Sequence, residues 1–321
     1  MRLIPIAGFC GAGKSLAALR LALQLDAEGK KVSVCLQKEN PITRALMEEY
    51  QITVTSGTPD STGACDAVIY ECDGFATGIK SRLSQLDGFE LAPLTVVCDP
   101  AKLHVLAAYG AALLGNAAYS EVVHCQLKEA DVVLLSHLDL QAASEAVHAM
   151  AAADAPGARI IAFSAKQGDG SDAWLEALQG EAAPALEIAP VEAVAARYDC
   201  SLHIAAPMGF FPDKFLKALA ERTRTALSAL PAPLTDFQAC TISDEGVAIF
   251  GCTDLNGIIR EDRLVNLCSI AGELHIQLGA NCDREYLCDV MYDVIQHTCT
   301  AMEQGMTIVG EYPSIWDDDL D

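Results

Sequence analysis

The sequence predicts an α/β protein: a parallel sheet covered by helices on both faces, followed by a smaller α+β region. In the first half, short apolar runs alternate with helical patterns. Most of these runs are continuously apolar, as expected for strands that are buried on both faces. After about residue 180 the pattern changes to a hairpin signal and separate strands and helices, which is typical of an antiparallel sheet.

The elements of the first half follow the order of a doubly covered parallel sheet. Two helices are predicted, at Leu16 to Leu25, where Gly29 ends the helix, and at Leu140 to Ala153. Strands that alternate with helices pair in parallel, because each helix carries the chain back across the sheet. The predicted strands are Leu3–Ala7, Lys31–Leu36, Ala67–Tyr70, Leu94–Cys98, Val132–Leu135 and Ile160–Phe163.

The second half begins after Gly180 to Pro190, a stretch rich in alanine and proline that indicates a linker. Asp244-Glu245-Gly246 stands between two strand patterns and predicts a hairpin. We therefore expect a first domain at 1–182, a second domain at 192–312 that binds a partner or cargo, and an acidic tail at 313–321. The predicted elements of the second domain are the strands Leu202–Ala206, Asp236–Ser243, Val247–Cys252 and Glu273–Leu278 and the helices Pro212–Leu230 and Arg284–Met302.

Composition restricts the partners and the compartment. The 321 residues include 21 Lys+Arg against 44 Asp+Glu, a formal net charge of −23. Such a surface repels phosphate backbones and anionic lipid, so we expect no nucleic acid and no membrane as partners. The first residues run directly into a glycine motif without a signal peptide, and no apolar run reaches the roughly 20 residues that span a bilayer. A cytoplasmic location is expected, and the 13 scattered cysteines are expected to be reduced.

The strongest motif is Gly8-Phe-Cys-Gly-Ala-Gly13-Lys14-Ser15, which has every fixed position of a P-loop between a strand and a helix. Backbone N–H groups of such a loop surround phosphate oxygens, and the helix N-terminus adds its positive dipole. Lys14 is expected to reach the β- and γ-phosphates, and the Ser15 hydroxyl to ligate Mg²⁺. The nucleotide-binding residues predicted here are Gly8, Gly11, Ala12, Gly13, Lys14 and Ser15.

A second motif, Glu71-Cys-Asp-Gly74, follows the third predicted strand. Ligands of parallel sheets bind at the carboxyl ends of the strands, so Glu71 is expected beside the P-loop. There it would hold Mg²⁺ through water or orient the attacking water, and the Gly74 N–H would sense the γ-phosphate. Lys14, Glu71 and Gly74 are the predicted catalytic residues.

A third pair of segments, Ser136-His137-Leu-Asp139 and Ser164-Ala165-Lys166, follows the last two predicted strands. A carboxylate such as Asp139 can accept the ring N–H and the exocyclic amine of guanine, whereas adenine offers neither in that arrangement. A backbone N–H of the second segment could donate to the guanine carbonyl. The predicted base-binding residues are Ser136, Asp139, Ser164, Ala165 and Lys166.

The order of these motifs, together with the strand at Val96 to Asp99 and the stretch Gln126 to Leu140, resembles the CobW-type P-loop GTPases. These are relatives of the hydrogenase and urease nickel-insertion GTPases. The resemblance covers about residues 1 to 180. It implies Mg²⁺ as cofactor, GTP as substrate, and GTP turnover that drives metal or cofactor delivery to a target metalloenzyme or cofactor-dependent protein. It also implies that a nucleotide-dependent homodimer or a partner completes the site.

Two departures from the family pattern affect these expectations. Ser136-His137 stands where the family has Asn-Lys, so guanine preference depends mainly on Asp139. The family's Cys-x-Cys-Cys metal motif is missing, because the interval before Glu71 holds only Cys35 and Cys65. The transition metal therefore stays unknown.

Other residues at the same edge are weaker candidates. Glu39 follows the second predicted strand and could contribute to Mg²⁺ binding or could lie in a solvated loop. Cys10, Cys72 and Cys98 could form a thiol site at this end of the sheet, or could be small, semi-buried residues in tight loops.

Two other function classes remain open from the sequence. One is a P-loop ATPase or small-molecule kinase, for which the lid arginines would be Arg222 and Arg224 or Arg260 and Arg263. The other is a nucleotide-gated scaffold with negligible turnover.

Overall fold

The computed structural model of the chain describes residues 1–109, 117–191, 196–228, 234–252, 258–302 and 305–310. The contacts divide the chain into two compact units, Met1–Ala193 and Val194–Asp321. The predicted acidic tail lies outside the described residues.

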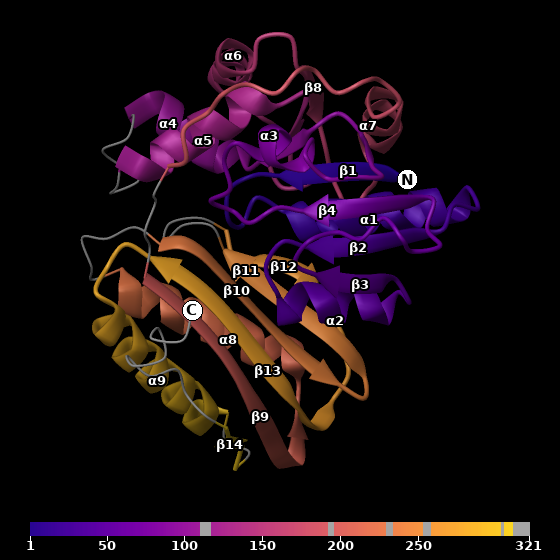
Figure 1. Cartoon of the computed structure of the whole chain (residues 1–321). Helices are drawn as coiled ribbons and strands as arrows, with labels where there is room; N and C mark the ends of the chain where they lie inside the picture. The colour runs from indigo at the N-terminus through magenta and orange to yellow at the C-terminus, as the bar shows by residue number, and fades with distance from the viewer. Residues whose placement is uncertain (110–116, 192–195, 229–233, 253–257, 303–304, 311–321) are drawn as a thin grey trace. The chain divides into compact units, whose positions relative to one another are not determined.

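Unit 1 is built on a parallel sheet with the strand order β3-β2-β4-β1-β6-β7-β8, and β5 pairs with β1 (Figure 1). All the strand pairs in this sheet are parallel. The predicted parallel sheet is confirmed. The strands are β1 (Arg2–Ala7), β2 (Val32–Leu36), β3 (Thr53–Ser56), β4 (Ala67–Glu71), β5 (Glu90–Leu91), β6 (Thr95–Cys98), β7 (Val132–Leu135) and β8 (Arg159–Ala162).

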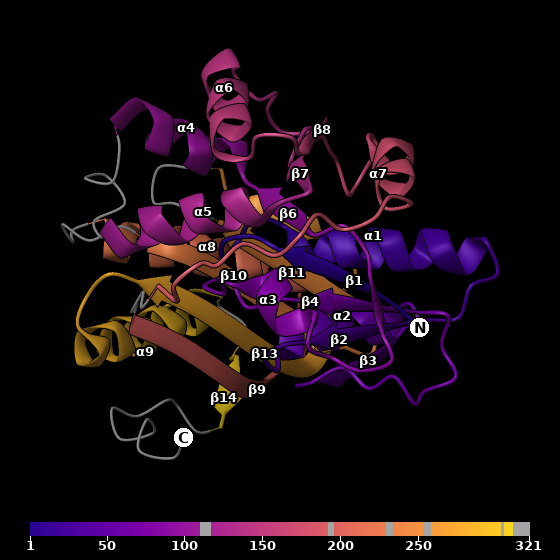
Figure 2. The ribbon, with the colours of Figure 1, turned by 45° about the horizontal axis from the view of Figure 1, so that its top comes forward.

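Helices cover the sheet in two groups. Helix α1 packs beside α7, while α6 contacts both α4 and α5 (Figure 2). The middle strands are buried along their whole length, which explains why they are continuous apolar runs in the sequence. The helices are α1 (Lys14–Ala27), α2 (Pro41–Glu49), α3 (Ile79–Leu83), α4 (Pro100–Tyr109), α5 (Ala117–Glu129), α6 (Glu145–Asp154) and α7 (Ser171–Ala177).

The predicted helix from Leu140 begins five residues later than expected. Ser144 caps α6, because its side chain accepts a hydrogen bond from the Val147 N–H at 3.3 Å. A hydroxyl in this position satisfies an N–H that has no partner within the helix. The residues before Ser144 form the turn that follows β7, and this turn contains the predicted base-binding segment.

Unit 2 is an antiparallel sheet with the order β12-β11-β10-β13-β9-β14. Its core contains alternate residues of the strands together with apolar residues of both helices, so α8 and α9 share one face of the sheet (Figure 1). The predicted α+β class is confirmed. The elements are β9 (Ala196–Phe210), α8 (Pro212–Leu227), β10 (Leu234–Ser243), β11 (Gly246–Cys252), β12 (Arg260–Arg263), β13 (Ser269–Ala280), α9 (Arg284–Ala301) and β14 (Thr307–Val309).

The longest strand differs most from the prediction. β9 runs from Ala196 to Phe210, well beyond the predicted Leu202–Ala206. Every second residue from Tyr198 to Ala206 is buried, so the strand alternates between a core face and an outer face along this stretch. Polar residues on the outer face interrupt the apolar run, which is why the sequence showed only its most apolar part.

Among the helices within the described part of the chain, none is long and apolar enough to cross a membrane.

Candidate functional site

The P-loop joins β1 to α1 and turns through three glycines with positive φ: Gly8 (137°), Gly11 (72°) and Gly13 (94°). Residues that carry a side chain rarely adopt these backbone angles, so the turn requires glycine at these positions. At Gly8 there is also no room for a side chain, because a Cβ there would collide with the carbonyl of Val97 on β6. The loop therefore lies directly on the sheet, at the carboxyl ends of β1 and β6.

Lys14 is the first residue of α1 and is largely buried. Its Nζ donates to the Gly8 carbonyl at 2.9 Å and to the Phe9 carbonyl at 3.4 Å. The ammonium is thus held by the loop itself. An ammonium in this place, together with the loop N–H groups, makes the loop suited to bind phosphate.

Three oxygen-bearing side chains meet next to the loop. The Ser15 hydroxyl donates to Glu71 Oε1 at 2.8 Å and lies 2.9 Å from Thr43 Oγ1. They come from α1, from the end of β4 and from the first turn of α2. Thr43 is completely buried, and its N–H donates to the Asn40 side chain that caps α2. Sequence reasoning missed Thr43; the available signal was Asn40-Pro41, which marks a helix start after β2.

Glu71 carries a carboxylate into a buried position. Burial raises its pKa, and the nearby Lys14 charge and the Ser15 hydrogen bond act in the opposite direction. Its Oε2 atom is buried and has no hydrogen-bond partner among the described residues. A buried oxygen without a partner costs free energy unless a ligand satisfies it. Together with the two hydroxyls, this atom forms a set of hard oxygen donors that suits Mg²⁺.

Glu39 does not belong to this group. Its carboxylate forms two hydrogen bonds with the Arg44 guanidinium, each at 2.6 Å, and these bonds lower the pKa of Glu39. The side chain is about half exposed. In the segment after β2, it is therefore Thr43 and not Glu39 that contacts Ser15.

The segment after Glu71 packs directly on the P-loop. A Cβ at Gly74 would collide with the side chain and backbone of Cys10, so only glycine fits this approach. The Gln126 side chain, buried on α5, donates to the Gly74 carbonyl at 3.1 Å and to the Ala76 carbonyl at 3.0 Å. The position of Asp73 is also fixed, because its backbone N–H donates a hydrogen bond to the Gln37 side chain. The predicted switch segment thus contacts both the P-loop and α5.

The predicted base-binding segments lie side by side. The Ser164 hydroxyl donates to Asp139 Oδ1 at 2.7 Å and accepts from the Gln167 N–H at 3.1 Å. Ser136 is buried instead, and its hydroxyl donates to the Cys98 carbonyl at 3.0 Å. Asp139 and Ala165 are half-buried and Lys166 is exposed. The structure therefore orients the Asp139 carboxylate through Ser164 and turns the Ser136 hydroxyl towards the sheet.

His137 links this region to the P-loop. Its φ is positive (57°), and a Cβ at Gly13 would lie 3.3 Å from His137 Cε1. The ring therefore packs near the point where the P-loop enters α1.

The three candidate thiols do not form a metal centre. Among the described residues, no group of three or more His, Cys, Asp or Glu side chains could hold a metal ion. Burial raises the pKa of both Cys72 and Cys98 to about 12, so these thiols are neutral near pH 7. Cys10 is half-buried against Gly74. The alternative interpretation, small residues in tight loops, describes these positions better.

No protein-family model and no curated protein matches the chain. Among solved structures, hydrogenase maturation factor HypB from Archaeoglobus fulgidus is similar at 18% identity, with 56% of this chain and 89% of that chain covered and a TM-score of 0.41. HypB from Helicobacter pylori in complex with nickel is 16% identical, with 56% and 87% covered and a TM-score of 0.39. The Zn(II)-bound YjiA GTPase from E. coli is 14% identical, with 92% and 98% covered and a TM-score of 0.38.

At these identities and TM-scores the likeness concerns the fold and carries no argument about activity. The assignment of a P-loop nucleotide-binding fold rests on the strand order of unit 1 and on the geometry of Gly8 to Ser15.

Proposed function

We propose that the chain binds GTP together with Mg²⁺, hydrolyses it, and couples this turnover to the delivery of a metal or cofactor to a target enzyme. The observation that carries the proposal is the meeting of Ser15, Thr43 and Glu71 beside the P-loop lysine. A phosphate-binding loop alone would explain Lys14. The three convergent oxygens beside it are what a nucleotide-bound Mg²⁺ requires.

The residues present fit Mg²⁺. Ser15 Oγ, Thr43 Oγ1 and the unpartnered Glu71 Oε2 would hold it, directly or through water. When bound, the ion neutralises negative charge on the phosphates. The chain's own contribution is to hold the β- and γ-phosphates between the loop N–H groups and Lys14, and to place the Glu71 carboxylate where it can orient the attacking water.

The preference for guanine rests on Asp139. Its carboxylate is fixed by Ser164 and can accept both N–H groups on the edge of guanine. Adenine would leave the Asp139 carboxylate unpaired, and a site built to hydrogen-bond its substrate rejects an analogue that lacks the matching donors. His137 would pack against the base or the ribose from the P-loop side.

Delivery of a metal or cofactor is the part of the proposal that rests on the motif resemblance. The target is a metalloenzyme or a cofactor-dependent protein, and the transition metal is not specified by any motif of this chain. A nucleotide-dependent homodimer or the target protein would complete the site during turnover.

The test compares GTP and ATP as substrates for the purified full chain in the presence of Mg²⁺, with a Lys14→Ala variant alongside. We expect GTP to be hydrolysed in preference to ATP, and the activity to be lost in the variant. Preference for ATP, or equal activity of the variant, would contradict the proposal. Tight binding of GTP and GDP with no turnover, with or without a partner, would instead favour the scaffold alternative.

A further inference from the structure

Lys102 lies on α4, an element outside the motifs discussed so far. Helix α4 starts directly after β6, and the Asp99 carboxylate accepts the Ala101 N–H at 2.8 Å, which fixes the first turn of the helix. The start of α4 is therefore anchored at the carboxyl end of β6, next to the strand that leads into the P-loop. From this position Lys102 extends towards the loop.

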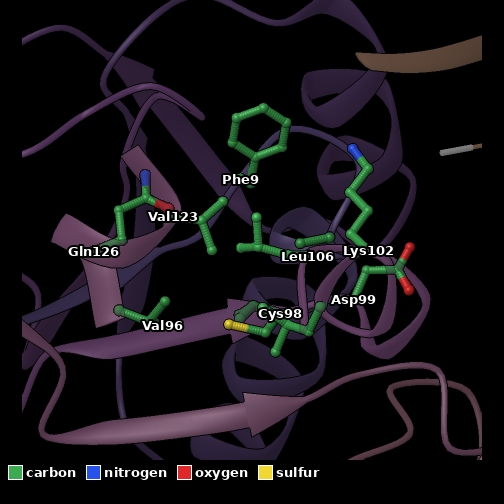
Figure 3. A pocket seen from close by; sticks show the side chains of 11 residues that line it. Phe9, Val96, Cys98, Asp99, Lys102, Leu106, Val123 and Gln126 are labelled. Carbon is green, nitrogen blue, oxygen red and sulfur yellow. The ribbon is translucent and has the colours of Figure 1, made fainter. Parts of the chain in front are cut away.

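The Lys102 ammonium interacts with two residues of the P-loop. Its Nζ donates to the Cys10 carbonyl at 2.8 Å and lies 4.7 Å from the centre of the Phe9 ring. Figure 3 shows Lys102 and Phe9 at a small pocket whose other walls are mostly apolar, formed by Val96, Leu106 and Val123 among others. A cation over an aromatic ring in a partly desolvated setting is held in place more firmly than a surface lysine.

The bond to Cys10 determines how one peptide of the loop is turned. The peptide bonds of the described residues are all trans, so the carbonyl of Cys10 and the N–H of Gly11 point in opposite directions. Because Lys102 holds the carbonyl on the α4 side, the Gly11 N–H is directed to the other side of the loop. Gly11 has a φ of 72°, an angle that glycine adopts without strain.

We propose that Lys102 is a positioning residue of the nucleotide site: its ammonium holds the Cys10–Gly11 peptide with the N–H directed to the phosphates of a nucleoside di- or triphosphate. This rests on the proposed nucleotide-binding function. Lys102 acts through the loop and does not touch the nucleotide. Its charge also opposes the strongly acidic field of a chain with a formal net charge of −23.

Loss of the Lys102 ammonium is expected to weaken the binding of the substrate and of the transition state equally. The Gly11 N–H contacts the phosphates in the substrate and in the transition state alike, so losing its orientation should raise KM and leave kcat unchanged. A residue that stabilises the transferring phosphoryl group would instead lower kcat. The two roles are therefore separable by steady-state kinetics.

The experiment uses the full chain and four substitutions. Lys102→Met keeps an unbranched side chain over Phe9 and in the pocket but removes the ammonium. Lys102→Arg keeps a charged donor. Lys128→Met on α5 removes the same charge from an exposed residue and serves as the control. Lys102→Gln is the second variant in case the methionine variant does not fold, which thermal unfolding without nucleotide will show.

We expect Lys102→Met to weaken the binding of GDP and of ADP by about tenfold, the size of one lost charge-assisted hydrogen bond. Lys102→Arg should restore most of the affinity, and Lys128→Met should match the wild type. With GTP as substrate, KM of Lys102→Met should rise by the same factor at constant kcat. Equal affinities of the Lys102→Met and Lys128→Met variants, or a fall in kcat at constant KM, would overturn the assignment.

Including ADP separates this inference from the proposed function. If the wild type binds ADP and not GDP, the proposed GTP specificity fails while the role of Lys102 is still decided on ADP. If the wild type binds neither diphosphate, both are overturned.

Discussion

The two units of the chain place their polar side chains differently. In unit 1, two hydroxyls and a carboxylate from separate elements converge at one edge of the parallel sheet, where Ser15 of α1, Thr43 of α2 and Glu71 of β4 meet. In unit 2, polar groups pair within the sheet: Arg197 of β9 bonds across β13 to Asp236 of β10, and Ser201 of β9 pairs with His275 of the neighbouring β13. Pairs of this kind stabilise a sheet, whereas at the unit 1 edge the buried Glu71 Oε2, which has no partner among the described residues, lies on a side chain that contacts the Ser15 hydroxyl next to the P-loop.

This difference explains why the candidate ligand-binding site lies in unit 1. The carboxyl ends of parallel strands all meet at one edge, so residues far apart in the sequence are brought to a single place. In an antiparallel sheet successive strands end at opposite edges, and the side chains of one face are spread across it. The comparison predicts that equivalent substitutions in the two units will differ in their effect on nucleotide chemistry.

The largest effect is expected for Lys14→Ala. Loss of the ammonium beside the phosphates should lower GTP hydrolysis by about 10²–10³-fold, as for removal of one preorganised electrostatic group. Lys217→Ala in unit 2, which removes a lysine paired with Glu261 at 3.0 Å on the surface, should leave the rate unchanged. Steady-state phosphate release measures both. A similar loss of GTP hydrolysis in both variants would contradict the proposed difference between the two units.

The second largest effect is expected for Thr43→Val. It removes the hydroxyl that contacts Ser15, so we expect the Mg²⁺ concentration for half-maximal hydrolysis to rise about tenfold. Thr241→Val in unit 2 is the matched control, because Thr241 is buried and its hydroxyl has no hydrogen-bond partner among the described residues. A titration of activity against Mg²⁺ checks both variants. An unchanged Mg²⁺ requirement for Thr43→Val would remove Thr43 from the site.

Ser164→Ala should have a smaller and more selective effect. Without its hydroxyl the Asp139 carboxylate loses a hydrogen bond of 2.7 Å, which is worth about 1 kcal/mol. The ratio of the GDP and ADP dissociation constants should then move towards equality by about fivefold. Calorimetry with both nucleotides gives the ratio, and Ser201→Ala in unit 2 is the control. A proportionate loss for GDP and ADP would show that Asp139 does not select the base.

The smallest effect concerns the thiols. Because burial raises the pKa of Cys72 and Cys98 to about 12, they should resist alkylation at pH 8 in the folded chain, whereas the exposed Cys268 should react. Timed labelling followed by peptide mass analysis distinguishes the three. Rapid labelling of Cys72 or Cys98 in the folded chain would reopen the candidate thiol site at this edge.

The sequence predicted the P-loop and Glu71 because each motif lies within a few residues of a strand end, where position follows from local pattern. Thr43 and Lys102 could not be predicted in the same way. Their contacts depend on how α2 and α4 are anchored after their strands, by Asn40 and by Asp99. A hydroxyl or an ammonium on a helix carries no local sign of which loop it will contact.

Contacts that the local sequence pattern does not reveal also explain why the predictions for Glu39 and for the length of β9 differ from the structure. Glu39 lies in the expected segment, but Arg44, five residues further on, binds its carboxylate at short distance. The length of β9 depends on pairing with β13 over most of its residues, which is a long-range property. Local apolar content alone shows only the central part of such a strand.

The outermost strands of the unit 2 sheet also determine how this unit can associate. One border is β12, whose four residues, Arg260 to Arg263, are all charged, and the other is β14, which has only three residues. Short and charged borders discourage a foreign strand from extending the sheet. Strand addition is therefore discouraged at the charged β12 border of unit 2, whereas β14 pairs with only His203 to Ala205 of the much longer β9.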